Sequence, residues 1–257
     1  MTPMTPMSLL ARSWHRLRYE IRLLGIGAWL LPLGIVVIYL GFSLFARAGA
    51  LRSGGADAQA RLQMGRGLLA LLENGLPLAA GLLAAVAVRQ DTAIELHLSL
   101  PVAYRGTALR RLGLVLLWVL VVAGFTSAIV VAADYWVFPV SGFDRQLFWL
   151  SPLFCLTTLG AALTLSFRSR VVSSAVLGML WIAQFLFKPV FLENGVSQRL
   201  YLFLSEEIFP DILAMNRALW YGVWLQNRLI LLAVALVLIV GVVALLGRNE
   251  ALLGDER

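Results

Sequence analysis

The sequence contains very few of the residues on which most catalytic and metal sites depend. Among 257 residues there is one cysteine, Cys155, one lysine, Lys188, and two histidines, His15 and His97. A single cysteine excludes an intrachain disulfide. Two separated histidines without cysteine partners do not supply the ligand cluster of a metal site. We therefore expect this chain to bind no metal and no other cofactor itself.

The single lysine also excludes one kind of nucleotide chemistry. A P-loop needs a lysine after a glycine-rich stretch, because its ammonium group contacts the β- and γ-phosphates. Lys188 instead stands between Phe187 and Pro189 at the edge of an apolar run. The paired glutamates Glu206-Glu207 are followed by no histidine, which argues against an intramembrane protease. We expect the chain not to be an enzyme.

Charged residues are scarce as well. They make up 14% of the chain, whereas 60% of its residues are hydrophobic. Soluble domains are usually about 25% charged and about 45–50% apolar. The net charge of +7 comes mainly from arginines at the ends of apolar stretches, where basic residues anchor membrane spans. The composition predicts an integral membrane protein in contact with lipids, and no nucleic-acid partner.

Six apolar stretches are long enough to cross a bilayer as helices, which takes about 17–25 residues. The sequence therefore predicts one all-α membrane domain over residues 1–257. The predicted spans cover residues 25–46, 68–88, 112–133, 147–167, 171–187 and 229–247. Residues 47–67 are predicted to be a flexible loop between the first two spans.

Residues 8–24 precede the first span and are predicted to form an amphipathic helix in the membrane interface. Wound as a helix, this stretch separates an apolar stripe from a basic side. The alternative is a plain basic anchor for the first span. The residues assigned to the interfacial helix are Arg12, Trp14, Arg16, Arg18 and Arg22.

Arginine placement predicts the orientation in the membrane. With six spans both termini lie on one side, and the tightest arginine clusters fall on that side. Basic residues favour the cytoplasmic face. We therefore expect both termini in the cytoplasm and the chain in the bacterial cytoplasmic (inner) membrane.

Two further stretches depart from a plain span. Residues 188–228 are apolar and aromatic but are interrupted by acids and proline, which predicts short re-entrant or interfacial helices before the sixth span. Glu73 and Asn74 form the only pair containing a charge inside a predicted span. Carboxylates inside membranes mark functional sites by default, so this pair is a candidate for a translocation pathway. The alternative is that Glu73 snorkels to the interface.

Small residues four positions apart predict close helix packing. Such pairs occur at Gly124/Ala128, Gly160/Thr164 and Ser174/Gly178. They carry no information about function.

The connection between the second and third spans, residues 89–105, carries the clearest motif. A charged stretch leads into a short apolar run, then Pro101-Val102, then basic residues. This resembles the coupling segment of type-2 ATP-binding-cassette (ABC) exporter permeases, which reads acidic residue, Gly-Thr-Leu-Glu, Leu-Leu, Ser/Thr-x-Pro and arginine. Residues 91–93 depart from the glycine–threonine of that pattern. The positions that fall on it are Glu95, Leu98, Ser99, Pro101 and Arg105.

The resemblance implies a permease subunit of an ABC exporter. A separate ABC ATPase subunit would bind ATP and Mg, and a second permease copy or a related permease would complete the pathway. The residues expected to couple the permease to the ATPase are Asp91, Glu95, Leu96, Leu98, Ser99, Pro101 and Arg105. The alternative function is a membrane scaffold or assembly subunit that transports nothing.

Overall fold

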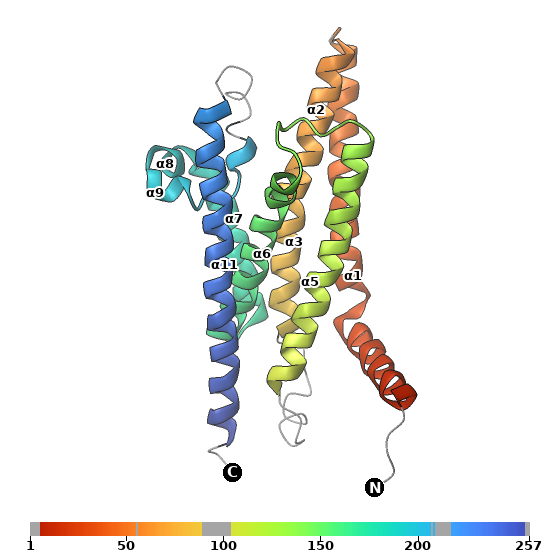
Figure 1. Cartoon of the computed structure of the whole chain (residues 1–257), viewed down its shortest axis with the longest axis vertical. Helices are drawn as coiled ribbons and strands as arrows, with labels where there is room; N and C mark the ends of the chain where they lie inside the picture. The colour runs from red at the N-terminus through yellow and green to blue at the C-terminus, as the bar shows by residue number, and fades with distance from the viewer. Residues whose placement is uncertain (1–5, 55, 89–103, 207, 209–216, 255–257) are drawn as a thin grey trace.

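The computed structural model describes residues 6–54, 56–88, 104–206, 208 and 217–254; for 6–24, 104, 217–219 and 248–254 only the backbone is described. All regular secondary structure in these residues is helical (Figure 1). The elements are α1 (Pro6–Arg52), α2 (Asp57–Ala70), the π-helical turn η1 (Leu71–Gly75), α3 (Leu76–Val88), α5 (Tyr104–Ala132), α6 (Phe143–Phe167), α7 (Arg170–Leu186), α8 (Lys188–Glu193), α9 (Gly195–Gln198) and α11 (Arg217–Gly254).

Among the described residues, five helical segments are long and apolar enough to cross a membrane, as expected of a multi-pass, all-helical membrane protein. They are Gly25–Arg52, Asp57–Val88, Arg105–Ala132, Phe143–Phe167 and Trp220–Gly247. The remaining predicted span, 171–187, corresponds to α7, an apolar helix of 17 residues. At 1.5 Å per residue α7 is about 25 Å long, somewhat shorter than the hydrocarbon core of about 30 Å.

The first helix is broken where the sequence separates a leader from a span. Gly25 has φ 75° and ψ 157°, outside the helical region, and this conformation favours glycine because it has no Cβ. Residues 8–24 are helical on one side of the break, as predicted, and run at an angle to the rest of α1 (Figure 1). The side chains of Arg12, Trp14, Arg16, Arg18 and Arg22 lie outside the described residues.

Several helices extend further than the hydropathy of the sequence predicts. The prediction of a flexible loop over 47–67 is wrong, because α1 continues to Arg52 and α2 begins at Asp57. At this turn the Asp57 carboxylate lies 2.9 Å from Arg61 Nε within α2 and 3.8 Å from Arg47 Nη2 of α1. In the same way α5 begins before residue 112 and α11 begins before residue 229.

The second and fourth spans form the centre of the bundle. α3 is packed most closely against α6, with α5 and α7 on its other sides. The two helices meet at Gly81 and Gly160: a Cβ on Gly81 would lie 2.7 Å from the carbonyl oxygen of Leu156. One turn on, Thr164 Oγ1 donates a hydrogen bond of 3.2 Å to the Ala85 carbonyl.

The Gly160/Thr164 pair therefore packs closely, as its spacing predicts. Gly124 and Gly178 do not, because no heavy atom of a neighbouring helix would lie within 4 Å of a Cβ at either position in the described structure.

We expect Gly160→Leu to destabilise the bundle because it would drive α6 away from α3. Overpacking of this kind costs about 1–3 kcal/mol. Gly178→Leu is the matched control, since its Cβ would meet open space. Thermal unfolding of the two variants in detergent measures the difference. Equal midpoints would show that α3 and α6 are not in contact at this glycine.

Candidate functional site

An ion pair lies inside the bundle between the second span and the last helix. Arg228 on α11 donates from Nη2 to Oε1 of Glu73 on η1, and the two residues are 155 positions apart in the sequence. Their side chains are 0% and 2% exposed. An unpaired charge at such a place would cost several kcal/mol, so each residue makes the burial of the other tolerable.

Glu73 reaches this position from an unusual stretch of helix. All five residues of η1 are buried, and the wider π-helical turn inserts one extra residue into the second span. A Cβ on Gly75 would lie 2.9 Å from Cε2 of Tyr39 on α1, so glycine allows α1 to close over the turn. π-helical turns occur frequently at functional sites, because they redirect side chains.

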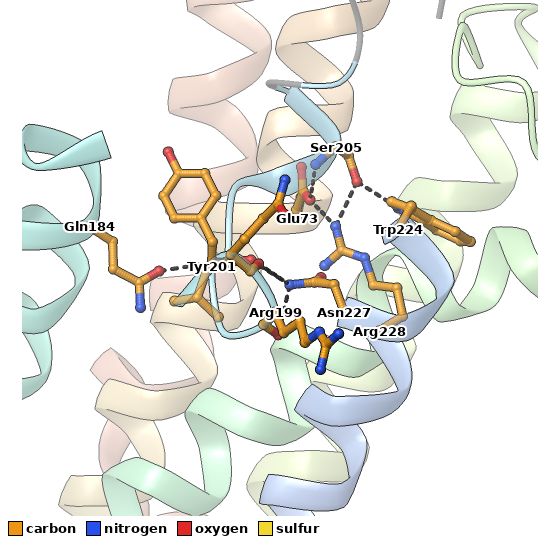
Figure 2. Close-up of polar contacts among 10 residues, drawn as sticks. Glu73, Gln184, Arg199, Tyr201, Ser205, Trp224, Asn227 and Arg228 are labelled. Atoms are coloured by element: carbon orange, nitrogen blue, oxygen red, sulfur yellow. Dashed lines mark hydrogen bonds and ion pairs between the residues drawn. The ribbon is translucent and has the colours of Figure 1, made fainter. Parts of the chain in front are cut away.

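Ser205 joins the two charges to the segment that precedes α11 (Figure 2). Its backbone N–H donates to Glu73 Oε1 at 3.1 Å. Its hydroxyl oxygen accepts from Arg228 Nη2 at 2.6 Å and from Trp224 Nε1 at 2.9 Å. The Arg228 guanidinium also lies 5.7 Å from the ring centroids of Phe148 and Trp224, which adds cation–π attraction.

The backbone just before Ser205 is held by two amide side chains. Asn227 Nδ2 donates to the carbonyls of Gln198, Arg199 and Tyr201 at 3.2, 3.0 and 2.9 Å. Oε1 of Gln184, on α7, accepts from the Leu202 N–H at 2.9 Å. We call residues 198–205 the pinned segment. Within it Tyr201 to Ser205 are buried.

The side chains that bond the pinned segment and one another are named here the polar cluster. They come from the second span, α7, the pinned segment and α11, and Figure 2 shows them converging from these elements. The polar cluster consists of Glu73, Gln184, Ser205, Trp224, Asn227 and Arg228.

The polar cluster retains unused hydrogen-bonding capacity. Nε and Nη1 of Arg228 and Oδ1 of Asn227 are buried and have no partner among the described residues, and the same holds for Oδ1 of Asn74 beside the cluster. Beside Glu73 and Ser205 lies a cavity of about 20 Å³, which is room for one water molecule. The site therefore holds a pair of opposite charges and has room beside them for a water molecule. Within the described ranges no group of three or more His, Cys, Asp or Glu side chains could hold a metal ion.

The structure places two of the predicted site residues in or beside the polar cluster. Glu73 is buried and paired, so the alternative in which it snorkels to the interface is wrong. Asn74 is 6% exposed and lies next to it. Arg105 is exposed in the first turn of α5. The other predicted coupling residues, Asp91, Glu95, Leu96, Leu98, Ser99 and Pro101, lie outside the described residues.

Sequence reasoning missed most of the polar cluster. Arg228 was assigned to the connection before the sixth span, yet it lies inside the apolar segment Trp220–Gly247. Its signal was an arginine flanked by long apolar runs, which in a membrane helix calls for an opposite charge on another span. Glu73 is that charge. Ser205 and Asn227 gave no signal of their own in the sequence.

Comparison of the chain with protein-family models, with curated proteins and with solved structures gives no match. The fold and site define its class as a multi-pass helical membrane protein with a buried charge pair.

We expect Glu73→Gln to destabilise the protein strongly, because it leaves Arg228 buried without a counter-charge. Breaking such a pair costs about 3–5 kcal/mol. The double variant Glu73→Met/Arg228→Met removes both charges and should recover more than half of that loss. Unfolding in mixed micelles measures all three proteins.

The control is Asp57→Asn, which breaks the pairs of Asp57 with Arg61 and Arg47 at the surface. Exposed pairs are worth about 0–1 kcal/mol, so this variant should match the wild type. A Glu73→Gln protein as stable as Asp57→Asn would contradict the structural role of the buried pair.

Proposed function

We propose that the chain is the permease subunit of an ABC exporter and works with a separate ATPase. The observation that carries this proposal is the order of helices. A leader helix ends at Gly25 and spans follow, with the short helices α8 and α9 placed before the last one. This order, together with the coupling motif in residues 89–105, resembles the architecture of type-2 ABC permeases.

In this proposal α7 is the fifth of six crossings. α6 ends near one end of the bundle, and α11 begins near the other (Figure 1). The chain must therefore return between them, and α7 is the apolar helix available for that return. Ser169 caps α7 by accepting from the Val172 N–H at 3.4 Å. α8 and α9 then lie in one leaflet as re-entrant or interfacial helices.

The coupling segment would dock on the ATPase. α3 ends and α5 begins at the end of the bundle where α1 starts and α11 finishes (Figure 1). In the proposed orientation this end faces the cytoplasm, where the ATPase binds ATP and Mg. Closure of the ATPase would displace residues 89–105 and bias the bundle between two states.

The polar cluster gives that displacement a route through the membrane. α3 is continuous with η1, and Glu73 on η1 bonds both Arg228 of α11 and Ser205 of the pinned segment. Movement of α3 therefore acts on the last span and on the segment that follows α9. In this proposal Glu73 and Asn74, which are 2% and 6% exposed within the bundle, remain the candidates for a translocation pathway that a second permease copy would complete.

Six crossings predict that both ends of the chain lie on one face of the membrane. In a Cys155→Ala background we expect Gly106→Cys and Arg257→Cys to react with an impermeant maleimide only after the membrane is opened. Ser53→Cys, in the exposed α1–α2 turn, should react in intact cells. Labelling of positions 53 and 257 from the same side would mean five crossings.

The coupling segment predicts an asymmetry between apolar and charged substitutions. Burying a leucine is worth about 1.5–3 kcal/mol, whereas an exposed ion pair contributes about 0–1 kcal/mol. Leu98→Asp should therefore abolish both transport and the co-purification of the ATPase. Glu95→Gln should reduce both only slightly.

Leu96→Asp serves as a second apolar variant for this test. If both aspartate variants retain the ATPase and wild-type transport, residues 89–105 are not a docking surface. If no ATPase co-purifies with the wild type, the chain is a scaffold or assembly subunit.

A further inference from the structure

A groove of about 760 Å³ runs along the seam between α1 and α2. Its apolar wall consists of Ile38, Phe42 and Phe45, whose side chains are 56%, 69% and 76% exposed. Its polar wall consists of Gln63 and Arg66 on α2 together with Glu206. The groove therefore joins an apolar surface to charges of both signs.

Close contact between the two helices forms the floor of the groove. A Cβ on Gly67 would lie 3.2 Å from Cβ of Ser43, and Ser43 is 2% exposed. The Ser43 hydroxyl donates a hydrogen bond of 2.7 Å to the Tyr39 carbonyl of its own helix. The helices α1 and α2 touch at Ser43 and Gly67. Phe42 and Phe45 line one side of the groove above this contact.

The sequence places this groove at the boundary between hydrocarbon and headgroups. The apolar run of α1 ends at Ala46, and the apolar run that continues into α3 begins at Leu68. Arg66 therefore stands at the level of the headgroups. Ile38 lies eight residues before Ala46, which is about 12 Å deeper along a helix, at the level of the acyl chains.

We propose that this groove binds one zwitterionic phospholipid from the leaflet on the side of the α1–α2 hairpin. The lipid phosphate lies toward Arg66, its ammonium group lies toward Glu206, and one acyl chain lies along Phe42 and Ile38. Such a headgroup carries both signs of charge, as the polar wall of the groove does. A headgroup with a net negative charge would instead meet the Glu206 carboxylate. The volume lies within the range of about 300–1,000 Å³ for small-molecule sites.

The groove also leads toward the polar cluster. Arg66, Ala70 and Glu206 line both the groove and the cavity beside Glu73. The headgroup of a bound lipid therefore lies next to the buried ion pair. This inference rests on insertion of the chain in a membrane and not on its proposed role as a permease, so the coupling-segment variants do not bear on it.

Native mass spectrometry of the full chain in detergent tests the proposal by titration with phosphatidylethanolamine and phosphatidylglycerol. We expect one phosphatidylethanolamine to bind at least tenfold more tightly than phosphatidylglycerol. Ala46→Trp fills the groove and should weaken this binding at least tenfold. The control is Leu44→Trp, on the same helix but outside the groove lining, which should leave it unchanged.

Charge variants test the headgroup contacts separately. Arg66→Gln should weaken binding of both lipids, whereas Arg61→Gln, outside the groove, should not. Glu206→Gln removes the negative charge and should shift the preference toward phosphatidylglycerol. Equal binding of the two lipids to the wild type, or no effect of Ala46→Trp, would overturn the proposal.

Two measurements need no groove-filling variant. Phosphatidylethanolamine with a photoreactive acyl chain should label peptides that contain residues 38–46, and labelling only elsewhere would contradict the site. Phe42→Cys in a Cys155→Ala background should stay monomeric on mild oxidation of membranes. Efficient disulfide-linked dimers would place a second copy of the chain in the groove in place of a lipid.

Discussion

A carboxylate and a guanidinium buried in an apolar bundle can persist only together, and much of this structure is arranged around that requirement. Glu73 and Arg228 are 2% and 0% exposed, so bulk water solvates neither charge. Their pairing fixes the rotation of η1 and the register of α11, two elements far apart in the chain. A shift of either helix would leave a buried charge without its partner, which would destabilise the fold by several kcal/mol.

The same interaction makes irregular backbone tolerable inside the bundle. A non-helical segment at membrane depth must find partners for its N–H and C=O groups within the protein. The pinned segment finds them in Glu73, Asn227 and Gln184. The polar cluster therefore pairs the two buried charges and also supplies hydrogen-bond partners to the backbone of the pinned segment. Through these contacts it connects the second span, α7 and α11.

Hydropathy predicted the five long apolar helices correctly and most of their ends poorly. The break at Gly25 and the limits of α7 fall where the sequence placed them, because glycine and the arginines at 168 and 170 mark those ends. The α1–α2 hairpin was missed because a helix that continues beyond the bilayer becomes polar, as from Arg47 to Arg61. Arg228 was missed because a hydropathy window treats an arginine as a boundary. Its partner is 155 positions away, so no local pattern reveals the pair.

The proposed permease function links residues 89–105 to the buried pair of Glu73 and Arg228. The central claim is that this chain is moved by a separate ATPase. Electron cryo-microscopy of the full chain, purified with its bound partners from its native membrane, tests that claim most directly. The account predicts a P-loop ATPase seated against residues 89–105. A complex without any nucleotide-binding chain, or one with the ATPase bound elsewhere, would contradict it.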